Sequence, residues 1–207
     1  MTKYAMAVDT TYCAACNTCA TTCKVENNLP EGVWWNLAKT EGGDWMYTPS
    51  GEYPDNLSLE FYTYSCQHCD DAACVNVCPT GASVKREDGI VWIDYETCIG
   101  CKSCVTACPY DGVRTYIEEE PRFFLDFAMG DWGAQTHKQG VVEKCTFCAH
   151  RVDRGERPAC VDVCPLQARY WGDLDDPESD ISKLLASRKW EQLSAETDTG
   201  SNFYLLK

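Results

Sequence analysis

The sequence lacks any long apolar run. Its longest stretch without a charged residue spans residues 10–23, and that stretch consists mainly of Thr, Cys and Ala. A membrane-spanning helix needs about 18 or more consecutive apolar residues, so we predict no direct membrane span. The residues before Cys13 have neither the apolar core of a signal peptide nor a twin-arginine motif, so we also predict no export signal.

Lysine and arginine are scarce. The chain has 18 of them against 32 aspartates and glutamates, which gives a net charge of −14. An acidic protein repels the phosphates of nucleic acids, so we predict no nucleic-acid partner. P-loop and dinucleotide-binding glycine motifs are also absent, as is a recognisable Ser/His/Asp group, which disfavours a self-contained enzyme. The remaining composition, 44% hydrophobic and 24% charged, is that of a globular chain with one or two domains.

Cysteine, by contrast, is abundant, with sixteen among 207 residues. The sixteen fall into four sets of four, and none is left over. Each set begins with C-x2-C and ends with C-x3-C; a proline follows sets two, three and four, whereas Lys24 follows set one. Set one is Cys13, Cys16, Cys19 and Cys23; set two is Cys66, Cys69, Cys74 and Cys78; set three is Cys98, Cys101, Cys104 and Cys108; set four is Cys145, Cys148, Cys160 and Cys164.

Three chemistries compete to explain these sets. Disulfide bonds are disfavoured, because the cysteines of one C-x2-C pair rarely meet disulfide geometry with each other. Structural zinc uses C-x2-C pairs separated by a longer loop and gives no reason for runs this tight. In iron–sulfur proteins, three closely spaced cysteines bind one cubane and the fourth, followed by proline, ligates the other cluster of a pair. The sequence therefore predicts four [4Fe–4S] clusters and electron transfer rather than catalysis.

The four sets form an internal repeat. Residues 74–79, 104–109 and 160–165 are copies of one another, and we expect a single helical turn between the cysteines of each copy. Apolar, β-rich stretches flank the sets and predict short strands at residues 5–8, 90–93, 113–117 and 169–171. This pattern indicates the small α+β ferredoxin unit, in which two strands and two helices surround two cubanes.

We predict an α+β fold of two nested ferredoxin-like units, each holding two [4Fe–4S] clusters. Sets two and three are close in sequence and define an inserted unit at residues 61–118. Sets one and four lie near the two ends and pair across it, which defines a second unit at residues 1–60 plus 119–207. Residues 24–65 and 118–140 contain Gly, Pro and aromatic residues and predict long irregular inserts.

A C-terminal helix is predicted to begin with Asp176 as its N-cap and Pro177 in its first turn. We expect its apolar stripe to pack against the rest of the chain, and docking of a partner helix is the alternative. The stripe consists of Ile181, Leu184, Leu185 and Leu193.

Several polar residues lie close to the cysteines. We expect His68 and His150 to make a hydrogen bond or a partner contact rather than to bind iron, because cysteines already supply all sixteen ligands. Three lysines could offset the negative charge of a cubane, although lysines are mostly solvated; these are Lys24, Lys102 and Lys144. Three arginines in the x11 insert of set four either bind an acidic partner or are solvated; these are Arg151, Arg154 and Arg157.

Motifs beyond the ligands extend over nearly the whole chain. They include YAMAVD at 4–9, CKVENN at 23–28, PEGV at 30–33, CQHCDD at 66–71, KREDGI at 85–90, KCTFC at 144–148 and GDLDDP at 172–177. Together with the cysteine sets, these motifs resemble the iron–sulfur subunit of dimethyl-sulfoxide-reductase-type molybdoenzymes. The resemblance implies an electron-transfer subunit that accompanies a large catalytic subunit, which carries a molybdopterin cofactor with Mo or W. Some members of the family add a membrane anchor that oxidises quinol.

The resemblance also implies which cysteines share a cluster. Position 101 is informative, because nitrate-reductase-like members have no cysteine there and carry a three-iron cluster; Cys101 indicates the sulfoxide, polysulfide and transhydroxylase side of the family. Cluster 1 takes Cys13, Cys16, Cys19 and Cys164; cluster 2 takes Cys23, Cys145, Cys148 and Cys160; cluster 3 takes Cys66, Cys69, Cys74 and Cys108; cluster 4 takes Cys78, Cys98, Cys101 and Cys104. In the family, clusters 3 and 4 face the donor and clusters 1 and 2 face the catalytic subunit.

Two other functions remain as alternatives. A free polyferredoxin would diffuse between partners, but such a carrier has no need of long aromatic inserts. A zinc-stabilised interaction module would contain no iron. We therefore expect a peripheral subunit of an anaerobic respiratory complex, held in place by its partners; export with the catalytic subunit and a cytoplasmic location are both open.

The metal content is the first testable prediction. Anaerobically purified protein should contain about sixteen irons and sixteen acid-labile sulfides per chain, because four cubanes carry four of each. Iron and sulfide assays with metal analysis measure this directly. Stoichiometric zinc would contradict the cluster assignment, and a three-iron EPR signal in untreated protein would contradict the role of Cys101.

Overall fold

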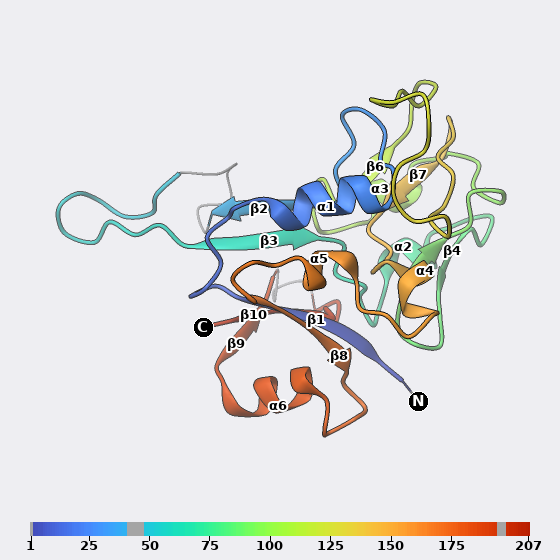
Figure 1. Cartoon of the computed structure of the whole chain (residues 1–207). Helices are drawn as coiled ribbons and strands as arrows, with labels where there is room; N and C mark the ends of the chain where they lie inside the picture. Colours follow the sequence, from blue (N-terminus) through green and yellow to red (C-terminus); the bar gives the residue numbers. More distant parts are fainter. Residues whose placement is uncertain (1, 41–47, 194–197) are drawn as a thin grey trace.

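The computed structural model describes residues 2–40, 48–193 and 198–207 (Figure 1). The described part contains short strands and helices in an α+β arrangement, as predicted. Its helices are α1 (Thr18–Glu26), α2 (Ala73–Asn76), α3 (Ser103–Thr106), α4 (Ala149–Val152), α5 (Ala159–Asp162) and α6 (Asp180–Ser187). Its strands are β1 (Tyr4–Asp9), β2 (Asn36–Thr40), β3 (Phe61–Ser65), β4 (Ser83–Lys85), β5 (Val91–Ile93), β6 (Arg114–Tyr116), β7 (Val142–Lys144), β8 (Arg169–Asp173), β9 (Trp190–Gln192) and β10 (Phe203–Leu206).

The largest sheet brings the two ends of the chain together. Its strand order is β8-β1-β10-β9, with β1 antiparallel to β8 and parallel to β10. Side chains alternate along β1, so that Ala5 and Ala7 pack with Ile181 of α6 while Met6 and Val8 pack with residues of cysteine set four. Helix α6 therefore covers one face of the sheet, and the cysteine-bearing segments lie against the other (Figure 1).

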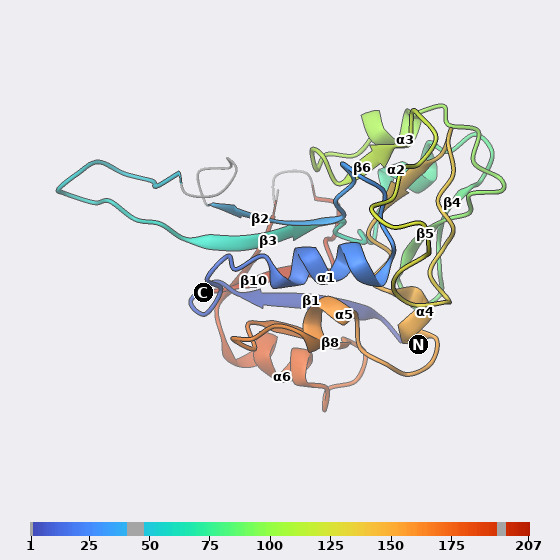
Figure 2. The same ribbon diagram turned by 45° about the horizontal axis from the view of Figure 1, so that its top comes forward.

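Three two-stranded ribbons complete the sheet structure. They pair β2 with β3, β4 with β5, and β6 with β7, all antiparallel. Two of these pairings cross the predicted unit boundaries, since β2 and β7 belong to the outer unit and β3 and β6 to the inserted one. Residues 48–60, which lead into β3, project away from the rest of the molecule in both views (Figure 1 and Figure 2). The predicted irregular inserts thus contain β2, β3 and the isolated bridge between Ser50 and Ser58.

The prediction of single helical turns between cysteines is confirmed. Helices α2, α3 and α5 have four residues each and carry the third cysteine of sets two, three and four. The proline after the fourth cysteine disfavours helical geometry for that cysteine, so these helices end before it. Lys24 replaces proline in set one, and there α1 continues through Cys23 to Glu26.

The predicted strands are present as β1, β5, β6 and β8.

The predicted start of the C-terminal helix is wrong. The N-cap of α6 is Ser179, whose hydroxyl accepts a hydrogen bond from Ser182 N at 3.2 Å, whereas the carboxylate of Asp176 caps only a turn by accepting from Glu178 N at 2.9 Å. Because α6 ends at Ser187, Leu193 is not on its stripe and packs instead with the cluster that contains Met6.

The hydrophobic core consists largely of residues around the cysteines. One cluster of buried residues includes Cys23, Cys74 and Cys104, and a second includes Cys19 and Cys160. Strand β10 is buried throughout and was not predicted from the sequence. Within the described residues, no helix has the length and apolar character needed to cross a membrane.

Iron removal is expected to unfold the protein. Cysteines occupy positions in both larger buried clusters, so the iron–sulfur clusters replace core that apolar side chains do not supply, and the iron–thiolate bonds contribute to folding directly. Circular dichroism of the chelator-treated protein should show loss of most ordered structure. A cooperative thermal transition that survives complete iron removal would contradict this prediction.

Candidate iron–sulfur centres

Four cavities in the structure are each lined by four cysteines. We number them as the clusters were numbered from the sequence, and all sixteen cysteines lie in the described residues. Cavity 1 is lined by Cys13, Cys16, Cys19 and Cys164; cavity 2 by Cys23, Cys145, Cys148 and Cys160; cavity 3 by Cys66, Cys69, Cys74 and Cys108; cavity 4 by Cys78, Cys98, Cys101 and Cys104. The fold therefore brings together the same four groups of side chains that were predicted as ligand sets.

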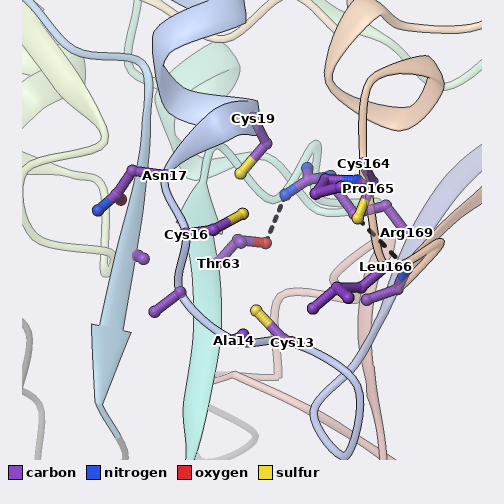
Figure 3. A pocket seen from close by; sticks show the side chains of 13 residues that line it. Cys13, Ala14, Cys16, Asn17, Cys19, Thr63, Cys164, Pro165, Leu166 and Arg169 are labelled. Carbon is purple, nitrogen blue, oxygen red and sulfur yellow. Dashed lines mark hydrogen bonds between the residues drawn. The ribbon is translucent and has the colours of Figure 1, made fainter.

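Cavity 1 shows how distant segments meet (Figure 3). Cys13, Cys16 and Cys19 come from the loop between β1 and α1 and from the first turn of α1. Cys164 comes from the segment between α5 and β8, on the opposite wall. The antiparallel pairing of β1 with β8 holds these two segments side by side.

The cysteine loops share one backbone feature. In every set, the residue before the second cysteine has a positive φ; these residues are Ala15 (49°), His68 (46°), Gly100 (66°) and Phe147 (54°). For a residue other than glycine this conformation costs on the order of 1–3 kcal/mol, and it persists only where the surroundings enforce it. Alternation of left- and right-handed residues turns backbone N–H groups toward one concave space, which favours an anionic group there. At Gly100 a side chain is also excluded, because a Cβ atom would lie 2.2 Å from Gly140 O.

Hydrogen bonds reach several of the sulfur atoms. Cys16 Sγ lies 3.4 Å from the hydroxyl of Thr18, and Cys101 Sγ lies 3.4 Å from the hydroxyl of Ser103, in equivalent positions of sets one and three. These hydroxyls lower the pKa of both thiols by donating to the thiolate. Backbone N–H groups donate to the fourth cysteines of sets two and four, from Ser83 to Cys78 at 3.4 Å and from Ala168 to Cys164 at 3.3 Å.

Burial has the opposite effect on most other thiols. It raises the pKa of Cys145 to about 12 and raises the pKa values of Cys23, Cys148 and Cys160, which also line cavity 2. Burial thus favours the protonated form of these four side chains unless a cation compensates the thiolate. Because the thiolate is the metal ligand, iron binding at cavity 2 must displace protons.

The lysines beside the cysteines differ from one another. Lys102 is exposed and lies over the ring of Tyr116. Lys24 is buried, and its Nζ donates to Pro30 O at 2.7 Å and to Val33 O at 3.1 Å. Lys144 is also buried, at 1% exposed, so the expectation of a solvated lysine is wrong at positions 24 and 144.

Two buried arginines were missed by the reasoning from sequence. Arg114 begins β6 and lines cavity 3, and Arg169 begins β8 and lines cavities 1 and 2. Each is the first residue of the strand that follows the fourth cysteine of its set, Cys108 or Cys164. That shared place in the repeat is the signal that could have identified them.

Arg114 provides a test of whether the cavities fit an anionic cluster. It is 5% exposed, and its three guanidinium nitrogens have no hydrogen-bond partner among the described residues. An uncompensated buried charge costs on the order of several kcal/mol, so an anion beside Arg114 is required to balance it. Four thiolates around an iron–sulfur core supply such negative charge in cavity 3. The residues present therefore fit the group.

The remaining candidates contact their own chain. His68 Nδ1 accepts from Val91 N at 3.0 Å, and burial lowers the pKa of His68 well below its usual value, so this ring is neutral. His150 Nε2 lies 3.1 Å from a Glu26 carboxylate oxygen. Both agree with the expected hydrogen-bonding role. The arginines of the set-four insert form ion pairs within the chain, and Arg154 and Arg157 are at the same time exposed to solvent, as expected of a solvated loop. The ion pairs are Arg151 with Asp162 at 2.9 Å, Arg154 with Asp131 at 2.6 Å and Arg157 with Asp162 at 2.6 Å.

Comparisons with known proteins agree with this geometry. A family model described as a 4Fe-4S dicluster domain matches residues 57–121 and 131–174. A putative dimethyl sulfoxide reductase iron-sulfur subunit of Halobacterium salinarum is 46% identical, over all of this chain and 79% of the relative. The arsenate respiratory reductase iron-sulfur subunit of a Shewanella species is 36% identical, over 99% of this chain and 96% of the relative. One of the chains of the polysulfide reductase of Wolinella succinogenes is 36% identical, over 90% of this chain and 84% of the relative.

These relatives are all subunits of reductases, and the matches extend well beyond the cysteine sets. A relative that is 46% identical over the full chain excludes a coincidence of cysteine spacing. The protein belongs to the family of iron–sulfur subunits of dimethyl-sulfoxide-reductase-type molybdopterin oxidoreductases, and its function is electron transfer without catalysis.

Proposed function

We propose that the protein binds four [4Fe–4S] clusters and passes single electrons through them in the order 4-3-2-1 or the reverse. The observation that carries this proposal is the series of four cavities, each lined by four cysteines. Each cluster, when bound, accepts one electron from one neighbour and gives it to the other. The cysteines of each cavity are the proposed ligands, with Cys13, Cys16, Cys19 and Cys164 at cluster 1 and the other three groups as they line cavities 2, 3 and 4.

Residues shared between cavities support this order. Arg169 lines both cavity 1 and cavity 2. Buried residues around Cys23 and Cys74 belong to one hydrophobic cluster, which places cavities 2 and 3 against the same core. Helices α2 and α3, which carry Cys74 and Cys104, contact each other and connect cavities 3 and 4.

Exposure supports the assignment of the two ends. Of the sixteen cysteines, only Cys16 in cavity 1 and Cys101 in cavity 4 are exposed. An apolar side chain lies near each, since Leu166 lines cavity 1 and is 47% exposed and Ile99 lines cavity 4 and is 66% exposed. Electrons can therefore enter and leave through the two terminal clusters, while no cysteine of cavities 2 and 3 is exposed.

We assign partners to these ends from the family. The relatives are subunits of dimethyl sulfoxide, arsenate and polysulfide reductases, so this protein is proposed to bind a large molybdopterin catalytic subunit at the Cys16 end. The Cys101 end is proposed to receive electrons from a quinol-linked anchor or a soluble carrier. Membership of a family of subunits disfavours a free polyferredoxin. The proposed location is peripheral, through these partners.

The two-unit organisation is proposed in the same way. Pairing of β1 with β8 joins the segments of sets one and four in the outer unit, residues 1–60 plus 119–207. Sets two and three, with α2, the β4–β5 ribbon and α3 between them, form the inserted unit at residues 61–118. Ribbons β2–β3 and β6–β7 fasten the inserted unit to the outer one.

The direction of the relay gives a testable prediction. In the intact complex, Cys101→Ser should reduce turnover with the physiological donor by at least about tenfold, because cluster 4 loses a thiolate ligand. Turnover driven by a small artificial reductant that feeds the catalytic subunit directly should be retained. The measurement is activity with each donor, in complexes whose subunit composition has been verified.

Ser103→Ala is the matched control for this experiment. It removes the hydroxyl beside Cys101 Sγ but keeps the thiolate, so turnover with the physiological donor should remain within about threefold of wild type because one hydrogen bond is lost. Equal loss of activity with both donors in the Cys101→Ser complex would show that cluster 4 is not at the donor end. Replacement of Cys16 should instead impair the docking of the catalytic subunit.

A further inference from the structure

Three buried cations lie at the boundaries between successive cavities. The first is Arg169, which is 5% exposed and lines both cavity 1 and cavity 2. Figure 3 shows its side chain reaching from β8 toward Thr63, with Cys19 and Cys164 on either side. Its Nη1 donates to the Thr63 hydroxyl at 2.6 Å, and its Nη2 lies 2.7 Å from the Met6 sulfur. These neutral partners orient the guanidinium and leave its charge uncompensated.

The second cation is Lys144, between cavities 2 and 3. Its Nζ donates to Cys145 O at 2.8 Å and also to Val91 O. Cys145 lines cavity 2 and Val91 lines cavity 3, so the ammonium group connects the walls of both. Burial lowers the pKa of Lys144, and the sulfur atoms of Cys66 and Cys74 in cavity 3 and of Cys145 in cavity 2 act in the opposite direction.

The third cation is Arg114, between cavities 3 and 4. It lines cavity 3, and β6, which it begins, contacts α3, the helix that carries Cys104 of cavity 4. Burial opposes the charge of Arg114, and the sulfur atoms of Cys74 and Cys66 in cavity 3 and of Cys104 in cavity 4 favour it, so that the pKa of Arg114 is raised.

The arrangement of these cations is unfavourable for the protein alone. Arg114 and Lys144 are directly opposite each other in the β6–β7 ribbon, and both are buried. Like charges in opposing positions of a ribbon repel each other, and burial adds a desolvation cost. Among the described residues, no carboxylate forms an ion pair with Arg114, Lys144 or Arg169. Within this part of the structure, the anions placed to compensate them are those of the cavities.

We propose that Arg169, Lys144 and Arg114 are counter-charges between neighbouring clusters, each favouring the reduced state of the clusters on both of its sides. Reduction adds one electron, and so one negative charge, to a cluster whose four thiolates already outweigh the positive charge of its core. A reduced cluster therefore repels the next electron from its neighbour. A fixed positive charge between the two attracts the added electron on either cluster and so offsets this repulsion, which makes reduction of both clusters more favourable. This inference rests on the proposed positions of the four clusters.

The test is a redox titration of the full-length, anaerobically purified protein, followed by EPR. Arg169→Met should make two of the four one-electron reductions less favourable, each by at least tenfold in equilibrium constant, or about 59 mV for one electron. Arg114→Met should shift the other two. Lys144→Met should shift one of the two reductions affected by Arg169→Met and one of the two affected by Arg114→Met, because Lys144 lies between cavities 2 and 3.

Charge-conserving variants are the matched controls. Arg169→Lys and Arg114→Lys keep the positive charge, so their potentials should stay near those of the wild type; Thr63→Val, which removes only the hydroxyl beside Arg169, should shift potentials less than Arg169→Met does. Potentials that are unchanged in the Met variants, or that shift as much in the Lys variants, would overturn the proposal. Should Arg169→Met fail to retain its iron, Arg114→Met tests the same idea at a different boundary.

Iron and sulfide content separates this proposal from the assignment of the clusters. A wild-type protein without about sixteen irons would contradict the proposed function itself. A fully loaded set of variants with unshifted potentials would contradict only the role of the three cations. A loaded Arg169→Met variant that shifts all four reductions equally would also count against the proposal, because it would indicate a general structural change.

Discussion

The concentration of sixteen cysteine thiols inside one small protein is the constraint on which the rest of this structure depends. Thiols that burial keeps neutral must become thiolates when iron binds, and the resulting negative charge has to be accommodated without water. The left-handed residues of the four cysteine loops, the N–H and O–H groups near sulfur and the buried arginines all serve this requirement. Apolar packing is secondary to this requirement, since even the two larger clusters of buried hydrophobic residues include cysteines.

The same constraint explains why the protein is a relay and has no active site of its own. Its enclosed interior is occupied by ligand-lined cavities, and only the two terminal ones have an exposed cysteine. No cysteine of cavities 2 and 3 is exposed. Chemistry on a substrate is left to the catalytic partner that this family of subunits serves.

The sequence predicted those features that depend on local spacing. Cysteine intervals predicted the four cysteine sets and the one-turn helices, and apolar stretches predicted four strands, since each is set within a few residues. The grouping of cysteines from different sets was implied by the family resemblance. Features that depend on distant segments were missed. Strand β10 is apolar but short, and only its place beside β1 makes it a strand. Lys144 is buried because Val91, 53 positions away in sequence, supplies an acceptor for its Nζ. The start of α6 was misplaced because Asp176 and Ser179 are both good N-caps, and tertiary packing decides between them.

The position of β10 beside β1 has a consequence for biosynthesis. Cys13 and Cys164 line the same cavity but are separated by about 150 residues, which take roughly 8–30 s to translate at 5–20 residues per second. Cys13, Cys16 and Cys19 are therefore made long before Cys164, and the sheet that holds them is complete only after β10 has been translated. All eight cysteines of cavities 3 and 4 are available once residue 108 has been made. On the proposed cluster assignment, the topology orders maturation: clusters 3 and 4 can form first, and clusters 1 and 2 are completed later.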